Sequence, residues 1–193
     1  MTTASAVPSI RRATSTDAAG LSAFAASVFP LGCPETAPSD LAAYIAAELS
    51  PAAFRALLEN PNVLVLLAET FAVQPAAAET KPIVAYMVVA RSSSHPLLSA
   101  PVLAEFRKLY LDPAYHGSGL ADELMQSAFA ILHAEGLRPI WLSTFSGNSR
   151  AIAFYKKWGF RIVGTQEFVV GTDRQKDFLM LYDPDSASGP EFD

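Results

Sequence analysis

The sequence predicts one α/β domain, in which helices flank a central, mixed but mostly antiparallel sheet. Its 193 residues suit a single compact domain, and a hydrophobic content of 51% supports a core and excludes a disordered chain. β-rich apolar runs alternate with stretches of helical periodicity, in the order β-α-α-β-β-β-α-β-α-β-β. We assign residues 1–183 to this domain and residues 184–193 to a polar tail.

Composition and charge exclude several classes of protein. The net charge of −5 argues against a nucleic-acid-binding protein. No apolar stretch approaches the roughly 18 residues of a membrane helix, and the first residues lack a secretory signal, so we expect a cytoplasmic protein without membrane contacts. The single cysteine, Cys33, excludes an intramolecular disulfide and a cysteine-based zinc site, and we expect no metal. No base lies near Cys33 in the sequence, so we interpret it as a loop or buried thiol.

The first half of the chain begins with a short strand at residues 9–14. Three helical stretches follow, at about residues 16–28, 39–49 and 51–59. Thr16 and Asp17 are candidate N-caps of the first stretch. Ser50 and Pro51 have the pattern of a cap followed by a proline at the first helical position, so they separate the second stretch from the third.

The pattern becomes β-rich after Pro61. Residues 62–71 and 82–91 are continuous apolar runs, typical of strands covered on both faces. Further strands are predicted at residues 103–111, 139–145, 160–168 and 176–182, helices at about 119–134 and 148–158, and loops at 73–82 and 91–101. Because a helix connects them, the strands at 103–111 and 139–145 are expected to be parallel.

A glycine-bearing loop between the strand at 103–111 and the next helix is the most informative segment. Gly117 and Gly119 remove side chains where the helix begins, which leaves its unpaired N–H groups open to an anion such as a pyrophosphate. The segment lacks the residues of a Walker loop and of a dinucleotide fingerprint. A tight strand-to-helix turn explains the two glycines, taken alone, about equally well. The apolar positions expected to pack this helix on the sheet are Leu120, Leu124, Ala128, Ile131 and Leu132.

Two short motifs lie on either side of the predicted strand at 139–145. The first, Arg/Gln-x-x-Gly-x-Gly/Ala, is overlaid by residues 116–121 (HGSGLA). The second, Asn-x-x-Ala-x-x-Phe-Tyr-x-x-x-Gly-Phe, is matched by Asn148, Ala151, Phe154, Tyr155, Gly159 and Phe160. In these motifs the chain resembles the Gcn5-related N-acetyltransferase (GNAT) superfamily, and the likeness extends from about Ile10 to Tyr182.

The resemblance implies that the fourth and fifth strands splay around acetyl-CoA, the co-substrate. It further implies that the coenzyme is bound by Leu109, Tyr110, Leu111, His116, Gly117, Ser118, Gly119, Leu120, Ala121, Asn148, Ala151 and Tyr155. The family usually has arginine or glutamine where this chain has His116. A neutral imidazole donates only one hydrogen bond, so we expect weaker or pH-dependent binding of the coenzyme. A solvated loop histidine is the alternative interpretation.

Transfer of an acetyl group from a thioester to an amine poses two proton problems. The alkylammonium, with a pKa of about 10.4, must lose a proton before it attacks, and the departing thiolate is helped by a proton donor. Tyr155 matches the family tyrosine that lies near the coenzyme sulfur, so it is the predicted donor, and packing in an amphipathic helix is the alternative. Glu105 lies at about the place of the family's base, although an ion pair with Arg107 is equally compatible with the sequence.

The closing segment resembles that of PaiA-type members of the superfamily. The shared pattern is formed by Phe168, Gly171, Gln175, Asp177 and Met180. This resemblance implies a polyamine acceptor, while the position of the pattern in closing strands is also compatible with a purely structural role. Earlier in the chain, Glu35 and Tyr44 are predicted to bind the substrate, and Asp40 and Glu48 add carboxylates that helix capping or a solvated face also explains.

The sequence therefore predicts an acetyl-CoA-dependent N-acetyltransferase that acetylates a primary amine of a small molecule. A polyamine is the favoured acceptor, and direct attack in a ternary complex is the expected mechanism. The alternatives are a non-catalytic acetyl-CoA-binding sensor or interaction module, or a transferase for an amino acid, an amine antibiotic or a protein N-terminus. A monomer or a homodimer is expected.

Overall fold

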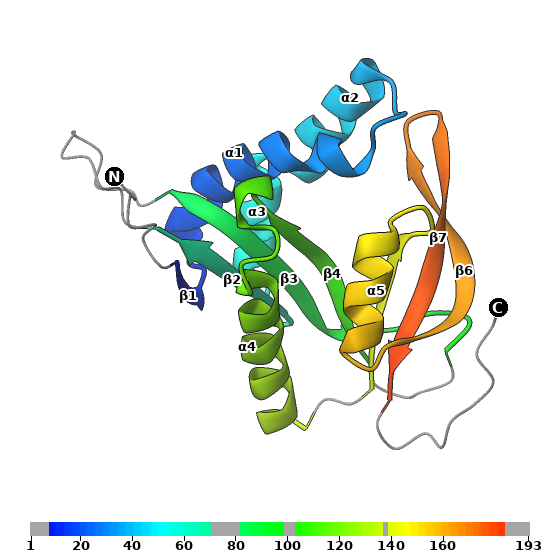
Figure 1. Ribbon diagram of the computed structural model, residues 1–193. Helices are drawn as coiled ribbons and strands as arrows, with labels where there is room; N and C mark the ends of the chain where they lie inside the picture. The colour runs from blue at the N-terminus through cyan, green and yellow to red at the C-terminus, as the bar shows by residue number, and fades with distance from the viewer. Residues whose placement is uncertain (1–7, 71–81, 99–102, 137–138, 184–193) are drawn as a thin grey trace, which may run out of the picture.

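The computed structural model describes residues 8–70, 82–98, 103–136 and 139–183. Within these residues the strands form one sheet in the order β1-β2-β3-β4-β5-β7-β6 (Figure 1). The strands are β1 (Ser9–Arg12), β2 (Val63–Glu69), β3 (Ile83–Ser93), β4 (Leu103–Leu111), β5 (Ile140–Phe145), β6 (Arg161–Val170) and β7 (Asp173–Tyr182). β4 and β5 are parallel and the other neighbours are antiparallel, which confirms the predicted class and the predicted parallel pair.

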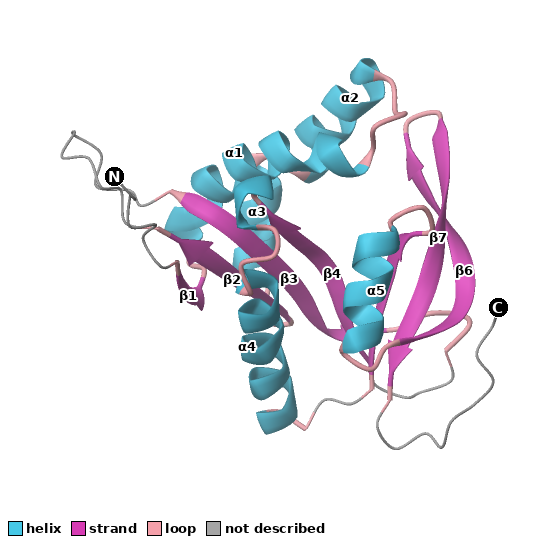
Figure 2. Cartoon of the chain, viewed as in Figure 1, coloured by secondary structure: helices cyan, strands magenta, loops and turns pink. Residues whose placement is uncertain are grey.

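Helices cover both faces of this sheet (Figure 2). They are α1 (Ala18–Val28), α2 (Pro38–Glu48), α3 (Pro51–Glu59), α4 (Leu120–Ala134) and α5 (Ser149–Lys157), with short 3-10 turns η1 (Ser15–Asp17), η2 (Phe29–Gly32) and η3 (Pro113–Tyr115). One large core forms between the sheet and the helices α4 and α5, and a second between the sheet and the helices α1, α2 and α3. A smaller third cluster contains Leu103, Trp141 and Leu179. The predicted apolar side of α4 is confirmed, because Leu120, Leu124, Ala128 and Leu132 are buried and Ile131 packs against the same cluster.

The stretch Pro38–Glu59 has a mean hydropathy of 1.3 and is long enough to cross a membrane by length and composition alone. In the structure it is two helices, because Ser50 caps α3 by accepting a hydrogen bond from the Ala53 N–H and Pro51 takes the first helical position. Leu49 and Phe54 are fully buried within the protein, so the apolar residues of this stretch contribute to the second core.

The predicted limits of some strands are wrong in instructive ways. β1 ends at Arg12 rather than at residue 14, and β3 continues to Ser93, into the segment predicted to be a loop. β6 and β7 are joined by a two-residue turn, because Gly171 adopts a positive φ of 59° and lets Val170 pair with Asp173. The predicted loop at 73–82, the last three residues of the predicted loop at 91–101 and the tail at 184–193 lie mostly or wholly outside the described residues.

The β6–β7 turn is fastened to α2, which lies next to it in Figure 1. The Asp40 carboxylate accepts hydrogen bonds from the Thr172 N–H at 2.8 Å and from its hydroxyl at 2.7 Å. These bonds lower the pKa of Asp40, so the carboxylate stays ionised at neutral pH. Asp40 is therefore used in holding the hairpin, and it does not line either cavity described below.

Candidate active site

A cleft opens where β4 and β5 diverge. The two strands pair only from Ala104 to Phe106, whereas β4 remains paired with β3 as far as Leu111. Arg107 is skipped in the β3–β4 register, and this bulge falls directly after the last residue that pairs with β5. Figure 1 shows α5 in front of the region where the two halves of the sheet separate. A cavity of about 520 Å³ occupies this region.

The cavity adjoins residues of β4 beyond the β5 pairing. Leu109, Tyr110 and Leu111 all line it. Among the described residues, none of β5 pairs with this part of β4, so backbone N–H and C=O groups on that edge are available to an extended ligand. This is the kind of strand edge that a peptide-like chain such as a pantetheine arm can follow.

The loop before α4 forms the end of the cavity that suits an anion. Gly117 and Gly119 adopt positive φ angles of 79° and 91°, which is why glycine is required there. A Cβ atom built at either glycine would meet nothing within 4 Å, so both backbones face open space. Gly119 is the N-cap of α4, and a ligand in the cavity can therefore reach the first N–H groups of a 15-residue helix.

His116 and Arg150 stand together at this end of the cavity. The Arg150 Nη1 atom lies 2.8 Å from the His116 Nδ1 atom, and both residues line the cavity. Burial and the neighbouring guanidinium lower the pKa of His116, so the ring is neutral at pH 7 and Nδ1 accepts the hydrogen bond. Arg150 thus supplies the permanent positive charge that the first motif lacks at His116.

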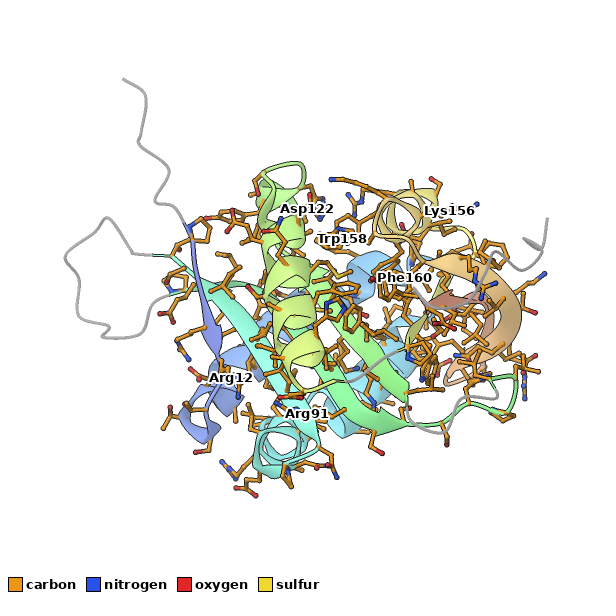
Figure 3. The ribbon with its side chains drawn as sticks, turned by 90° about the horizontal axis from the view of Figure 1, so that it is seen from below. Arg12, Arg91, Asp122, Lys156, Trp158 and Phe160 are labelled. Atoms are coloured by element: carbon orange, nitrogen blue, oxygen red, sulfur yellow. The ribbon has the colours of Figure 1, made fainter. Side chains whose placement is uncertain are left out.

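Helix α5 forms the opposite wall. Asn148 caps it by accepting a hydrogen bond from the Ala151 N–H at 3.0 Å, and both residues line the cavity. The C-terminal end of α5 is tied to α4, because the Trp158 Nε1 atom and the Lys157 ammonium both donate to Asp122 at 3.0 Å. Figure 3 shows Trp158 lying between the two helices, close to Asp122. This contact fixes the position of Tyr155, one turn earlier on α5.

A second cavity of about 180 Å³ lies against the first. The residues that line both are Gly32, Leu109, Tyr110, Asn148, Ala151 and Tyr155. Tyr155 is half-buried and packs against Phe154 and Phe160, with ring centroids 5.5 and 5.8 Å away. Burial raises the pKa of Tyr155, so its hydroxyl keeps its proton at neutral pH. A protonated phenol thus stands where the two cavities meet.

The structure does not bring all the predicted residues into these cavities. Ser118 donates its hydroxyl to the Tyr115 carbonyl, and Leu120 points into the core, so neither side chain lines the first cavity. Glu105 accepts hydrogen bonds at 2.9 Å from Arg107 and from the Ser93 hydroxyl, and it lines neither cavity. This is the ion pair of the alternative interpretation.

The two predicted substrate-binding residues also lie outside the cavity walls. Glu35 is exposed in the turn before α2. Tyr44 is packed in the core, where its ring stacks on Phe29 with centroids 4.6 Å apart. Burial raises the pKa of Tyr44 to about 12, and the Lys108 ammonium lies 5.9 Å from its ring centroid. Tyr44 therefore stands behind residues that line the second cavity rather than among them.

Sequence reasoning missed several residues of the site. From the end of α1 and the following turn, Val28, Leu31 and Gly32 line the first cavity although they are remote from both motifs. Arg150 lies inside the second motif, but at one of its variable positions, so only its charge in the first turn of α5 marked it. In the second cavity the missed residues include Arg107, Lys108 and Ser143.

A family model identified by its description as the acetyltransferase (GNAT) family matches residues 41–160, which is more than half of the chain. The chain belongs to the GNAT family.

Its relatives agree with this assignment. An uncharacterized N-acetyltransferase of Mycobacterium bovis is 36% identical over 167 residues, which cover 86% of this chain and 97% of the relative. Among solved structures, the PaiA N-acetyltransferase of Thermoplasma acidophilum in complex with coenzyme A has a TM-score of 0.70 at 21% identity, covering 92% of this chain and 99% of that one. Arabidopsis thaliana NAA60 in complex with acetyl-CoA has a TM-score of 0.69 at 14% identity, covering 93% of this chain and all of that one. The two structural matches show the same fold.

This GNAT protein is an acetyl-CoA-dependent N-acetyltransferase. The residues of its first cavity fit the coenzyme: two glycine backbones and a helix N-terminus for the phosphates, a guanidinium beside them, and a free strand edge for the pantetheine arm. The cavity volume of about 520 Å³ is in the usual range for a ligand site. The separate role of each residue stays a prediction.

We expect substitution of His116 to change acetyl-CoA affinity in a pH-dependent way. Burial and the Arg150 charge lower the pKa of His116 from the usual 6.5, so the ring is neutral at pH 8 and gains its charge only at acidic pH. A bound phosphate favours the charged ring. In His116→Ala, the dissociation constant measured by calorimetry should therefore rise about tenfold at pH 5.5 and under about threefold at pH 8.

The matched control is His95→Ala, since the His95 ring contacts Gln166 and lines neither cavity. The change in acetyl-CoA affinity between the two pH values in His95→Ala is subtracted from the change in His116→Ala, which removes the effect of titrating the coenzyme phosphates themselves. An equal loss at both pH values would mean that His116 contributes only as a neutral hydrogen-bond donor. No loss at either would mean a solvated loop histidine.

Proposed function

We propose that this enzyme acetylates a primary amine of a small molecule by direct attack within a ternary complex. The observation that supports this most is the meeting of two cavities at Tyr155, one suited to the coenzyme and a smaller one for the acceptor. Cys33 also lines the smaller cavity, but burial raises the pKa of its thiol, so it is a poor nucleophile at neutral pH. Transfer without a covalent enzyme intermediate is therefore the simpler route.

Bound acetyl-CoA supplies a thioester whose carbonyl carbon accepts the amine nitrogen and whose sulfur leaves. Asn148 and the free edge of β4 hold the thioester end of the coenzyme where the two cavities join. Tyr155, kept protonated by burial, donates its proton to the sulfur as the carbon–sulfur bond breaks. The nitrogen loses its remaining extra proton at the same stage, which restores the tyrosine hydroxyl directly or through water.

A polyamine is the first acceptor that we propose. Gln175 and Asp177, two residues of the closing pattern that resembles PaiA-type enzymes, line the smaller cavity, which supports a role in acceptor binding. The carboxylates predicted earlier do not provide this support, because Glu35 and Glu48 are exposed and line neither cavity. A polyamine would place its reacting nitrogen in the smaller cavity.

An amine that also carries an anionic group, such as an amino acid, is the second candidate. Arg107 and Lys108 line the same small cavity, and their positive charges favour a carboxylate or phosphate on the acceptor. Burial is the main cause of the lowered pKa of Lys108. A buried ammonium without an anion nearby costs free energy, so an acidic group on the acceptor would be favoured here.

The experiment is thiol release from acetyl-CoA with spermidine, hexylamine, L-lysine and glycine as acceptors. On the polyamine proposal, kcat/KM for spermidine exceeds that for hexylamine by about tenfold, which corresponds to about 1.4 kcal/mol for a second ammonium. The difference should lie in KM rather than kcat, because the second charge stays remote from the reacting nitrogen. Equal rates with both amines, or a preference for an amino acid, would contradict the polyamine proposal.

A further inference from the structure

The smaller cavity contains a buried carboxylate that the proposed mechanism has not used. Asp177 lies on β7, is only 5% exposed and forms part of the cavity wall. Among the described residues, its Oδ1 atom has no hydrogen-bond partner. A buried carboxylate oxygen without a donor costs free energy, and a ligand that donates a hydrogen bond or carries a positive charge would recover it.

The groups around Asp177 come from several elements. β4 contributes Arg107, Lys108 and Tyr110, α5 contributes Tyr155, and the turn after α1 contributes Cys33. Arg107 already pairs with Glu105, and the Lys108 ammonium lies over the Tyr44 ring. In the part of the chain that the structure describes, Asp177 is thus the single carboxylate in the wall of this cavity.

Asp177 shares the wall of the second cavity with the proposed proton donor, Tyr155. The pKa of Tyr110 is raised mainly by burial and, to a smaller extent, by the charges of surrounding groups that include both Tyr155 and Asp177. Tyr110 lines both cavities. A nitrogen held by Asp177 would therefore be close to the junction at which Tyr155 acts.

We propose that Asp177 binds the ammonium group of the acceptor and removes the proton that must leave before attack. The proposal rests on the acetyl transfer to a primary amine described above, and it assigns the base that Glu105 was predicted to be. The Glu105 carboxylate is held by Arg107 and Ser93 outside both cavities. Asp177 is in the cavity wall and carries a free oxygen.

The proton balance is complete with these groups. The ammonium R–NH₃⁺ gives one proton to the Asp177 carboxylate, which leaves R–NH₂ with a lone pair for the carbonyl carbon and a neutral aspartic acid. After the carbon–sulfur bond breaks, the sulfur holds the Tyr155 proton and the nitrogen has lost its second proton to the tyrosine. Asp177 then releases its proton to water. The products are the amide, the free thiol and one proton.

Burial makes Asp177 a better base than an exposed aspartate. It raises the pKa of this carboxyl, and a hydrogen bond from Ser143 lowers it to a smaller extent. A higher pKa of Asp177 reduces the difference in pKa between its carboxyl group and the ammonium that gives up the proton.

The test compares Asp177→Asn with the wild-type enzyme, using spermidine and L-lysine as acceptors between pH 6.5 and 10. At pH 7 we expect kcat/KM to fall at least about 100-fold, the scale of a lost general base. The difference should shrink toward pH 10, where the free amine is abundant in solution. Acetyl-CoA affinity should stay within about twofold, since Asp177 does not line the first cavity.

Two further variants keep the result interpretable. Glu167→Gln removes an exposed carboxylate of the same hairpin, which is paired with Arg174, and should leave kcat/KM unchanged. Asp177→Glu keeps a carboxylate in the cavity and should restore part of the rate at pH 7. Glu105→Gln is made in parallel, and a pH-dependent loss there instead of in Asp177→Asn would overturn the proposal.

Other outcomes are equally decisive. Wild-type kcat/KM in Asp177→Asn would overturn the proposal, and so would a loss that is the same at every pH, because proton removal predicts recovery. If the wild-type enzyme acetylates neither amine, the proposed acceptor class fails. Calorimetry then tests Asp177 separately. If the wild-type enzyme binds spermidine or L-lysine and Asp177→Asn does not, the contact of Asp177 with the ammonium is supported. If the wild-type enzyme binds neither amine, the proposal for Asp177 is overturned.

Discussion

Gly119→Glu is expected to abolish acetyl-CoA binding while the protein stays folded. The glycine is the N-cap of α4 and faces the first cavity, so a glutamate there would bring a side chain and a negative charge to the phosphate end of the site. Calorimetric titration should detect no binding at millimolar acetyl-CoA. The positive φ of 91° adds a backbone cost of about 1–2 kcal/mol for any non-glycine residue.

Two variants separate these effects. Gly136→Glu introduces the same charge at a glycine with a similar positive φ of 72°, beyond the other end of α4 and outside both cavities. It should unfold at about the same temperature as Gly119→Glu and still bind acetyl-CoA. Gly119→Ala introduces the backbone strain without the charge and should weaken binding to a smaller degree. Undiminished affinity in Gly119→Glu would refute the assignment of the phosphates to this loop.

Tyr155→Phe should lower kcat by about 100-fold or more, with little change in acetyl-CoA affinity. The substitution keeps the ring that packs between Phe154 and Phe160 and removes only the hydroxyl. Because burial raises the pKa of this hydroxyl, the wild-type enzyme should show no loss of rate from its ionisation below pH 10. Steady-state kinetics and thermal melts of both proteins measure the effect.

The control for Tyr155→Phe is Tyr115→Phe. Tyr115 lines the first cavity but not the second, so removal of its hydroxyl tests whether any phenol near the coenzyme affects the rate. We expect kcat of this control to stay within about threefold of wild type. A near-native kcat in Tyr155→Phe would return Tyr155 to a packing role and leave proton donation to water.

The coenzyme side of the site was the part most open to prediction from the sequence, for a local reason. The glycines that require positive φ, the cap of α5 and the strand before the loop all lie within continuous motifs, and β4 has the predicted limits of Leu103 and Leu111. Constraints on backbone angles and helix caps depend on residues that are close together in the sequence, so a short motif reveals them. Helical periodicity likewise identified the buried side of α4.

The acceptor side could not be predicted in the same way, because its walls come from distant segments. The sequence leaves Glu105 open between a catalytic base and an ion pair with Arg107, and only the fold shows that Arg107 and Ser93 occupy its carboxylate. Asp177 is in the sequence a member of the closing pattern that has a structural explanation as well, and its burial in the cavity wall is a property of the assembled sheet. No local pattern distinguishes these two cases.

The contact between the start of α2 and the β6–β7 hairpin has a consequence for engineering this enzyme. Thr36 and Gln175 both donate hydrogen bonds to the Asp173 carboxylate, and Asp40 accepts hydrogen bonds from Thr172, so the segment from Thr36 to the first turn of α2 and the closing hairpin are matched at several atoms. A chimera that exchanges only one of these segments with that of a relative would break the match, because each polar group is shaped to the other segment. Exchanging either segment between GNAT enzymes of this kind therefore requires both segments to be moved together.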